Sequence, residues 1–372
     1  MSLEDGSSLR AIAFYLPQFH PIAENDRWWG KGFTEWTNVV RARPLFRGHY
    51  QPHLPADLGF YDLRVPEVRE AQAALARAHG IHGFCYYHYW FNGVRLLNRP
   101  VDEVLHSGRP EFPFCLCWAN ENWTRRWDGL DHEILIRQEY SDDDDRAHIE
   151  HLLPYFADRR YLTVDGRPLF LVYRTELLPD PARTAASWRS RARAAGLPDL
   201  YLVRVEGTRS NINPKSIGFD AALEFAPDKR VVRPVLRRAR RGFRPRIEAA
   251  LRRIGLISPR THEHRIYSYD SLATGMLSKP APAWRRFRSV TPAWDNSPRR
   301  AEGADIFLGS TPNRFGAWLS TAATLTREAF RGDERVLFIN AWNEWAEGNH
   351  LEPDQEWGLT YLEATARVLL NL

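Results

Sequence analysis

Eight short apolar runs, spread along the chain and separated by helical patterns, constrain the fold more than any other feature. Each run has the length and composition of a strand buried on both faces, which is typical of a parallel sheet. The runs are Leu9–Tyr15, Gly83–Tyr87, Phe112–Cys117, Pro168–Tyr173, Leu200–Val205, Ala221–Phe225, Phe287–Thr291 and Arg335–Ile339. Amphipathic helical patterns are clearest at Pro66–Ala78, Asp142–Phe156, Ala182–Ala195 and Phe315–Phe330. Strands alternating with helices predict the α/β class and a single (β/α)8 barrel with long loops at its C-terminal face.

Length and composition agree with one large unit. The chain has 372 residues, of which 44% are apolar, and barrels of this kind often occupy such a length alone. A doubly wound open sheet is the competing fold, but the sequence has no Gly-rich turn of the nucleotide-binding type. We expect residues 9–372 to form the barrel domain. Residues 1–8 are interpreted as a tag-like or disordered segment, which leaves open that an upstream piece is missing.

Targeting and redox signals are weak. No stretch approaches the roughly 20 apolar residues that cross a bilayer, and Met1–Leu9 lacks the apolar core of a signal peptide, so a cytoplasmic location is expected. Cys85, Cys115 and Cys117 are an odd number of thiols inside apparent strands, where small buried cysteines are common. We expect no disulfide framework, and Cys115 and Cys117 without further ligands are a weak metal signal.

Aromatic residues are abundant, with 14 Trp, 14 Tyr and 19 Phe, and many stand beside carboxylates and amides. Sugars present flat C–H faces and hydroxyl edges, so a carbohydrate site needs aromatic platforms with polar groups at the rim. In a barrel the residues that follow the strands gather at one end. The candidate substrate-binding residues are Tyr15, His20, Glu35, Trp36, Tyr87, His88, Trp90, Trp118, Asn120, Glu121, Glu206, Trp294, Asp295, Trp342 and Asn343.

Some of these candidates also have simpler explanations. His88 lies in an aromatic run and fits a core histidine as well as a sugar contact. Glu35 and Trp36 belong to a long first loop that could be a packed lid. The four aspartates Asp142–Asp145 suggest a cation site, but they also suit the start of the following helix, whose dipole favours negative charge.

Glu344 and Glu347 are the candidate catalytic pair. They follow the last strand-like run, and in a helical turn their spacing brings the two carboxylates together on one face. Like charges that close cannot both ionise easily, so one carboxyl is expected to keep a proton while the other serves as a base. The simpler reading is an exposed turn with two solvated glutamates. Trp342, Asn343 and His350 nearby favour a built site instead.

The segment from Phe338 to Gly348 resembles the catalytic motif of the endo-α-mannosidases of glycoside hydrolase family 99, and the whole chain is more similar still to bacterial WbsX-type proteins. That group is found with polysaccharide and O-antigen (lipopolysaccharide) assembly genes. Further segments that carry the resemblance are Phe14–His20, Gly32–Trp36, Gly83–Phe91, Cys117–Trp123 and Thr291–Asn296. The resemblance implies a retaining, endo-acting glycoside hydrolase-like barrel that needs no cofactor.

The resemblance also implies roles for the two glutamates. Glu344 would deprotonate the sugar 2-hydroxyl, which attacks its own anomeric carbon, and Glu347 would be the general acid and later the base. The substrate would be an internal α-linked, α-mannosidic or related bond of a bacterial polysaccharide. Ala346 departs from the histidine that the hydrolases carry between the glutamates, which puts substrate identity in doubt.

A basic segment interrupts the barrel pattern, within an insertion at about 229–265. Lys229–Arg253 holds 11 basic residues and one acid, with apolar residues interleaved. Such a segment can lie on an anionic membrane surface or hold a lipid-linked glycan, which would make the protein membrane-peripheral, or it can be a solvated loop. The chain's net charge is +5, but no nucleic-acid motif accompanies it, and nucleic acid is not an expected partner.

Two other functions stay open beside hydrolysis of a polysaccharide or oligosaccharide. The chain could be a glycosyltransferase or transglycosylase of polysaccharide biosynthesis, as the gene association of WbsX-like proteins suggests. It could also be a glycan-binding barrel without turnover. The presence of both glutamates favours an active site, but it leaves the direction of the reaction open.

Overall fold

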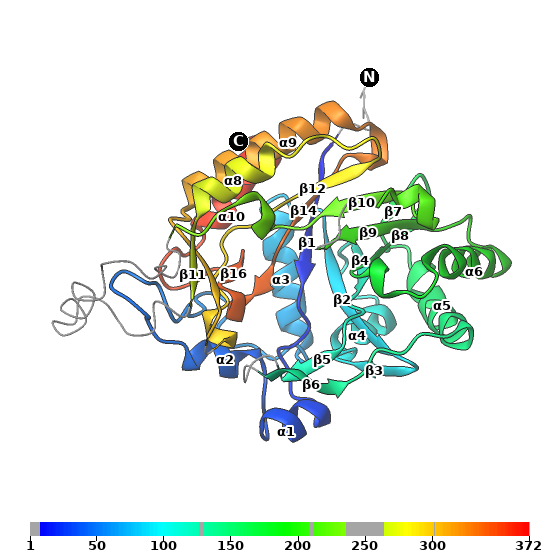
Figure 1. Cartoon of the computed structure of the whole chain (residues 1–372), viewed down its shortest axis with the longest axis horizontal. Helices are drawn as coiled ribbons and strands as arrows, with labels where there is room; N and C mark the ends of the chain where they lie inside the picture. The colour runs from blue at the N-terminus through cyan, green and yellow to red at the C-terminus, as the bar shows by residue number, and fades with distance from the viewer. Residues whose placement is uncertain (1–7, 126–129, 208–211, 236–263, 301, 372) are drawn as a thin grey trace, which may run out of the picture.

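The computed structural model describes residues 8–125, 130–207, 212–235, 264–300 and 302–371. Eight parallel strands close into a barrel, because the sheet order runs β1-β14-β12-β10-β9-β8-β4-β2 and β2 pairs again with β1 (Figure 1). The barrel strands are β1 Arg10–Tyr15, β2 Gly83–Phe91, β4 Phe114–Trp118, β8 Arg167–Val172, β9 Tyr201–Glu206, β10 Ala221–Glu224, β12 Arg286–Val290 and β14 Val336–Ile339. Each coincides with one of the eight predicted runs, so the predicted (β/α)8 barrel is confirmed.

The helices lie outside the barrel, and one of them begins well before the residue predicted from apolar periodicity. They are α1 Ala23–Trp29, α2 Glu35–Arg41, α3 Pro66–Ala78, α4 Arg99–Ser107, α5 Asp142–Phe156, α6 Pro181–Ala194, α8 Tyr269–Leu277, α9 Pro312–Ala329 and α10 Thr360–Leu369. Helix α9 begins three residues before the predicted start because Thr311 caps it, accepting a hydrogen bond from the Arg314 backbone N–H. Helix α5 begins where predicted, with Ser141 as its cap.

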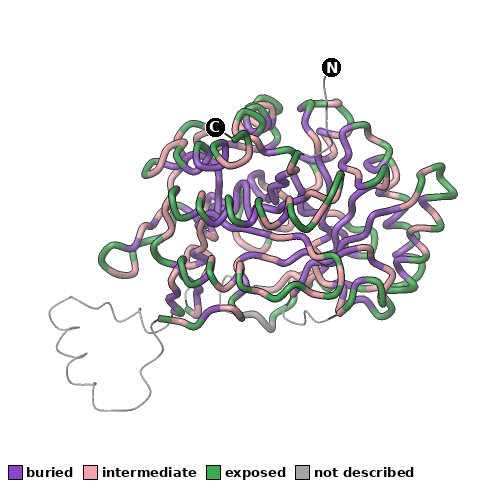
Figure 2. Tube along the Cα trace, turned by 90° about the horizontal axis from the view of Figure 1, so that it is seen from above, coloured by how far each residue is buried: buried purple, intermediate pink, exposed green. Residues whose placement is uncertain are grey.

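The strand interiors form the core. Residues Ala11–Tyr15, Cys115–Trp118 and Leu169–Val172 are almost fully buried, and Figure 2 shows burial concentrated on the central strands with exposure on the surrounding helices. Strands buried on both faces explain why the runs were apolar throughout rather than alternating. The three cysteines are buried free thiols of this core, as expected.

Short extra strands decorate the ends of the barrel. They are β3 Val94–Leu96, β5 Trp123–Arg125, β6 Leu130–Ile136, β7 Thr163–Val164, β11 Arg265–Ser268, β13 Asp305–Leu308, β15 Asn343–Glu344 and β16 Asn349–His350. The run predicted at Gly83–Tyr87 continues to Phe91 because β3 pairs with its second half. Strands β11 and β13 form a separate parallel pair. These short strands form through tertiary contacts, and the apolar pattern of the sequence does not indicate them.

The basic insertion predicted at about 229–265 falls between β10 and β11. Its stretch 236–263 lies outside the described residues, as does most of the segment 1–8, so the domain boundaries stay a prediction. Lys229–Val231 forms a short 3-10 turn, η4, directly after Asp228. Within the described part of the chain, no helix is long and apolar enough to span a membrane.

Candidate active site

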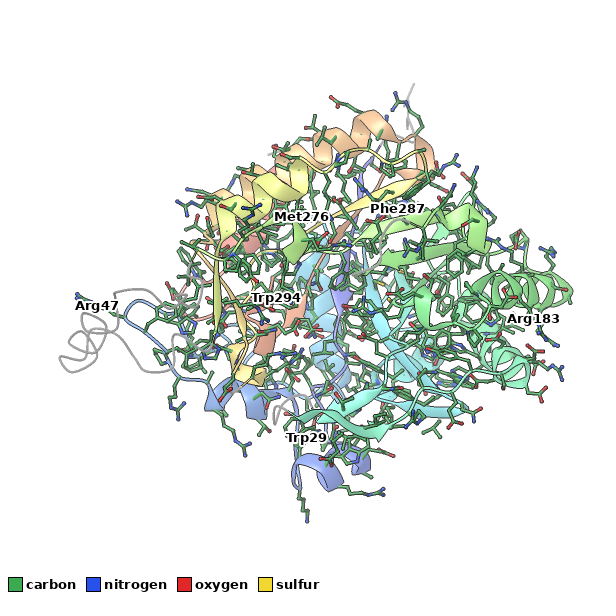
Figure 3. The ribbon with its side chains drawn as sticks, in the orientation of Figure 1. Trp29, Arg47, Arg183, Met276, Phe287 and Trp294 are labelled. Atoms are coloured by element: carbon green, nitrogen blue, oxygen red, sulfur yellow. The ribbon has the colours of Figure 1, made fainter. Side chains whose placement is uncertain are left out.

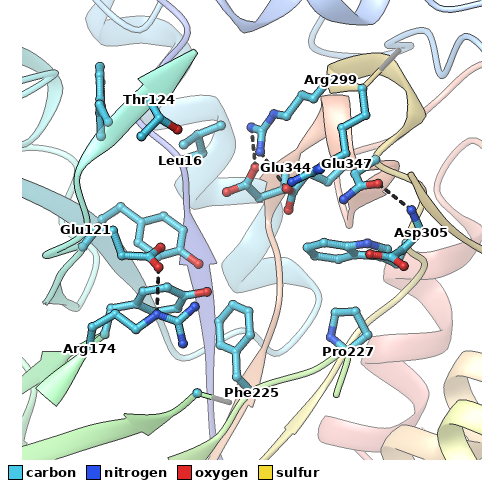
Figure 4. A pocket seen from close by; sticks show the side chains of 18 of the residues that line it. Leu16, Glu121, Thr124, Arg174, Phe225, Pro227, Arg299, Asp305, Glu344 and Glu347 are labelled. Atoms are coloured by element: carbon cyan, nitrogen blue, oxygen red, sulfur yellow. Dashed lines mark hydrogen bonds and ion pairs between the residues drawn. The ribbon is translucent and has the colours of Figure 1, made fainter. Parts of the chain in front are cut away.

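A pocket of about 480 Å³ opens among the loops that follow the barrel strands (Figure 4). Figure 4 shows Glu121 and Arg174 on one side, Arg299 with Glu344 and Glu347 across from them, and Phe225 and Pro227 along another wall. The volume is within the range usual for ligand pockets. Its position at the C-terminal end of the strands is the one at which barrel enzymes carry their chemistry.

A small hairpin after β14 holds the two glutamates. Strand β15 pairs antiparallel with β16, and the 3-10 turn η8, Trp345–Glu347, joins them. Glu344 precedes the turn and Glu347 ends it, so the spacing predicted for a helical turn is realised. The Trp342 backbone N–H donates to the Phe14 carbonyl at 2.8 Å, which ties the hairpin to the end of β1.

Asn343 and Gly348 fix the position of this hairpin. The Asn343 side chain donates to the Leu16 carbonyl at 3.0 Å and accepts from the Leu16 N–H at 2.7 Å. Gly348 has φ +56, and a Cβ there would lie 3.1 Å from the Asp295 Cβ. A side chain at Gly348 would therefore be strained and would push the neighbouring loop away.

Buried aromatic side chains and one carboxyl group surround Trp345. The Trp345 indole stacks on His350 with ring centroids 3.8 Å apart and donates to Glu352 at 2.6 Å. Tyr61 donates to the same Glu352 carboxyl at 2.7 Å. Burial raises the pKa of Glu352 to about 7, opposed by these hydrogen bonds. The aromatic residues of the motif thus serve as the scaffold beneath the glutamates.

Arg299 binds three glutamates at once. Its Nε donates to Glu35 at 2.6 Å, its Nη2 to Glu344 at 2.8 Å and its Nη1 approaches Glu347 at 2.9 Å. The Glu35 side chain is fully buried and that of Glu344 is 8% exposed, whereas Glu347 is 18% exposed and faces the pocket more openly. Three carboxylates against one guanidinium leave this cluster with an excess of negative charge.

That excess shifts the acid–base behaviour of the cluster. Burial raises the pKa of Glu344 to about 8; Arg299 opposes the shift, and Glu347 and Glu35 reinforce it. Burial also raises the pKa of Glu35. Burial alone would lower the pKa of Arg299, but its three carboxylate neighbours hold that pKa well above the ordinary value. Near neutral pH the Glu344 carboxyl therefore carries a proton much of the time, while Arg299 stays charged.

The structure brings some of the candidate residues together around this pocket. Tyr87, Glu121, Glu206 and Trp294 line it, as do Glu344 and Glu347. Trp294 lies near the centre of the molecule in Figure 3, and Trp29, which also lines the pocket, is on α1. The pocket thus combines carboxylates with aromatic rings.

The other candidates lie behind the pocket and make internal contacts. Glu35 supports Arg299, and Asp295 binds His49 at 2.6 Å and Gln51 at 2.7 Å. His88 pairs with His148 at 3.0 Å. The remaining candidates outside the pocket lining are Tyr15, His20, Trp36, Trp90, Trp118, Asn120, Trp342 and Asn343. All are buried, so in this conformation they support the walls of the pocket and are not positioned to contact a ligand.

Several hydrogen bonds show how buried polar residues support the fold around the site. Asn120 accepts from the Arg174 backbone N–H at 2.7 Å and donates to the Arg174 carbonyl at 2.9 Å, which holds the loop after β8. The Trp90 indole donates to Asp144 at 2.8 Å. Asp144 and Asp145 are thereby used within the fold, and Asp145 accepts from Thr184 at 2.6 Å. The aspartate run acts at the start of α5.

Sequence reasoning did not single out several residues of the pocket. Arg299 is the most consequential, and other lining residues are Gln18, Tyr89, Trp123, Phe225 and Arg300. Arg299 follows the motif Thr291–Asn296 in a polar, proline-containing stretch with no pattern of its own. The sequence around Glu344 and Glu347 contains no basic residue close by. This was the one available signal that a cation from another segment pairs with them.

One group of residues in the described part of the chain could hold a metal ion. Ligand atoms of His53, His350 and Asp354 all lie within 4.8 Å of one another, and none of the three residues lines the pocket. His53 Nδ1 and His350 Nε2 are 2.9 Å apart, and His350 Nδ1 donates to the Glu352 carbonyl at 2.9 Å. A hydrogen bond between two neutral imidazoles accounts for this arrangement without an ion.

The chain matches one protein family and two curated relatives over nearly its whole length. A family model described as glycosyltransferase WbsX matches residues 11–365. Two curated relatives called uncharacterized protein WxcX, from Xanthomonas campestris pv. campestris strains B100 and ATCC 33913, are 46% identical over 358 residues. The match covers 96% of this chain and 49% of each relative, so the chain spans about half the length of the curated relatives it matches.

Solved structures share the fold at low identity. A glycoside hydrolase-like protein has a TM-score of 0.58 and 13% identity, with 99% of this chain and 95% of that chain covered. The GH99 endo-alpha-mannosidase from Bacteroides thetaiotaomicron has a TM-score of 0.56 and 15% identity, with 97% and 96% covered. Both likenesses extend over nearly the whole of each chain and concern the barrel architecture.

Proposed function

The chain belongs to the WbsX glycosyltransferase family, and we propose that its barrel pocket cleaves an internal α-linked bond of a bacterial polysaccharide with retention. The observation that carries the proposal is the position of Glu344 and Glu347. Both carboxylates meet one guanidinium at the rim of a pocket that aromatic side chains also line. An α-mannosidic bond is the specific candidate, by likeness to the endo-alpha-mannosidase whose fold the chain shares.

Carboxylates this close together suit neighbouring-group participation better than attack across the scissile bond. The usual two-carboxylate schemes place the groups on opposite sides of the sugar. In the proposed route Glu344 takes the proton of the sugar 2-hydroxyl, whose oxygen bonds to the anomeric carbon and forms a 1,2-anhydro sugar. Glu347 gives its proton to the departing glycosidic oxygen. Glu347 then takes a proton from water, which opens the epoxide, and the 2-hydroxyl oxygen regains its proton from Glu344.

The surroundings support these roles. Glu344 is the more deeply buried carboxyl, so once ionised it is a stronger base than a solvated glutamate. Glu347 is the more exposed of the two and can reach a leaving group or water. Burial also raises the pKa of Tyr87 and of Tyr89, so their hydroxyl groups stay neutral donors in the pocket.

The pH dependence of kcat/KM should report the ionisation of Glu344. The base works only after it has lost its proton and the acid only while it keeps one, so the profile should be bell-shaped. Because burial raises the pKa of Glu344 to about 8, one limb of the wild-type profile should lie near pH 8. That limb should be absent from the residual activity of Glu344→Gln. A wild-type profile without an ionisation near pH 8 would remove Glu344 from the reacting pair.

Transfer rather than hydrolysis is the second candidate, favoured by the glycosyltransferase description of the matching family model. The motif analysis offered no Gly-rich phosphate cradle, so we expect no heat of binding with common nucleotide sugars in titration calorimetry. Tight binding of one nucleotide sugar, together with elongation of a glycan, would replace hydrolysis with transfer. Transglycosylation would appear as longer products without any nucleotide.

A panel experiment tests the proposal as a whole. The protein is incubated with bacterial polysaccharides and α-mannans, and mass analysis of the products distinguishes shortened, lengthened and unchanged glycans. Incorporation of heavy oxygen from labelled water at the new reducing end identifies hydrolysis. Binding without any product change on a full panel would favour a glycan-binding barrel.

Contact of the segment Lys229–Arg253 with an anionic membrane or a lipid-linked glycan remains part of the proposal. Co-sedimentation of the protein with anionic vesicles tests this contact.

A further inference from the structure

A second charged group lines the pocket, and its charge is opposite to that of the glutamate cluster. Lys229, Arg230, Arg265 and Arg300 all line the pocket, together with the carboxylates of Asp228 and Asp305. Glu206 is a further lining carboxylate whose charge acts on Arg230, so four cations against three carboxylates leave a formal charge of +1. Around Arg299, three glutamates against one guanidinium leave −2 when all are ionised. We refer to the four cations as the basic end.

The parallel pair β11–β13 builds one half of the basic end. It sets Arg265 opposite Asp305 in register, and the Arg265 Nε donates to Asp305 at 2.6 Å. Lys229, from the turn η4, reaches the other oxygen of the same carboxylate at 2.6 Å. The Asp305 side chain is 2% exposed, whereas Lys229 and Arg265 are 49% and 47% exposed. One buried carboxylate thus orients two half-exposed cations of the pocket lining.

The other half has the same design. Asp228 accepts from Arg230 and pairs with Lys279 at 2.7 Å, and its side chain is 8% exposed. Arg230 is 38% exposed, whereas Lys279 is 10% exposed and lies behind it. This second buried carboxylate again holds two cations. Its partner Lys279 adds one more positive charge beneath the basic end.

Arg300 completes the basic end and is unlike the others. It follows Arg299 directly in the chain and lines the same pocket. No hydrogen bond or ion pair joins its side chain to any residue that the structure describes. Among the described residues this half-buried guanidinium has no carboxylate partner, so its N–H donors can serve a ligand.

We propose that the basic end binds a phosphate group carried by the glycan substrate. The proposal rests on the proposed function, and it adds the substrate class: an anionic, phosphate-bearing glycan. The arginine donors suit phosphate oxygens, which they bind in pairs, and a formal charge of +2, with Lys279 counted, matches phosphate better than the single charge of a carboxylate.

The basic end and the glutamate cluster together would orient the substrate. Like charges repel, so a phosphate is disfavoured beside the glutamates and favoured beside the four cations. The bond placed over Glu344 and Glu347 would then be set by its distance from the phosphate. The phosphate could be a substituent within the polysaccharide or the diphosphate that links a glycan to a lipid carrier.

Binding of inorganic phosphate and pyrophosphate by the whole protein tests the inference without any turnover. In titration calorimetry at low ionic strength we expect binding of one or both, and Arg300→Gln should weaken it about tenfold, which corresponds to about 1.4 kcal/mol. Lys229→Gln should also weaken it, while Arg265 still satisfies Asp305. The matched control is Arg47→Gln, which removes an exposed arginine far from the pocket and should change nothing (Figure 3).

The outcomes divide clearly. Tighter binding of pyrophosphate points to a diphosphate linkage, and tighter binding of phosphate points to a substituent; both support the inference. Absence of binding, equal binding by Arg300→Gln, or equal affinity for glucuronate overturns it. Phosphate binding in a protein that cleaves no glycan would leave this inference standing and reject the proposed function. Cleavage of neutral glycans without anion binding would do the reverse.

Discussion

Glu347→Gln and Glu344→Gln should each lower turnover at least about a hundredfold, as expected when general acid or base assistance is lost. Glutamine keeps the shape of the side chain and can still accept from Arg299, but it cannot carry the proton that the reaction moves. The measurement is kcat and KM on any glycan that the wild-type protein cleaves. We expect the loss mainly in kcat, because the missing step is proton transfer rather than binding.

A matched substitution controls for nonspecific effects on the fold. Glu363 is an exposed glutamate in the first turn of α10, outside the pocket lining, and Glu363→Gln should leave kcat unchanged. The unfolding midpoints of both pocket variants should stay near that of the wild type. Near-normal turnover by either Glu347→Gln or Glu344→Gln would remove that residue from the catalytic role.

Arg299→Met should be the most destabilising single change at the site. It leaves Glu35, which is fully buried, and Glu344 without their counterion, and breaking a buried ion pair in this way costs about 3–5 kcal/mol. Because the Arg299 side chain retains 14% exposure, we expect the lower end of that range. Urea unfolding at pH 8 measures the loss, and Arg183→Met, an exposed arginine on α6, is the control with little effect (Figure 3).

The pH dependence of this loss tests its electrostatic origin. Without the guanidinium, the folded-state pKa values of Glu35 and Glu344 rise further above the unfolded value. Such groups stabilise the fold below the unfolded pKa of about 4.5 and lose that contribution as pH rises through the folded pKa. The deficit of Arg299→Met should therefore shrink near pH 4 and grow toward pH 8.

A double variant tests the same cause from another direction. Adding Glu35→Gln to Arg299→Met removes a buried negative charge and should recover part of the lost stability. Gln18, which donates to Glu35 at 3.2 Å, can still donate to the glutamine oxygen. A deficit independent of pH and of Glu35→Gln would mean that Arg299 acts through packing rather than charge.

The barrel and the helix at Pro66–Ala78 could be predicted because their signals are local. A strand buried on both faces must be apolar at each position, and a helix against a barrel must repeat its apolar face, so each leaves its period in the sequence. The first residues of the helices were predicted less well than the strands. Helix α9 begins at Pro312 because Thr311 caps it, and a cap leaves no mark in the apolar periodicity. The strands β11 and β13 were missed because they pair with each other outside the barrel sheet.

The sequence by itself determined the barrel, the turn that carries Glu344 and Glu347, and its place after the last strand. Only the tertiary structure decided which side chains meet there. Arg299 is 45 residues from Glu344 and 264 from Glu35, and Trp118 and Asn343 proved to be supports rather than pocket walls. The physical reason is that burial and periodicity act along neighbouring residues, whereas charge compensation in a cleft joins loops whose sequence separation carries no pattern.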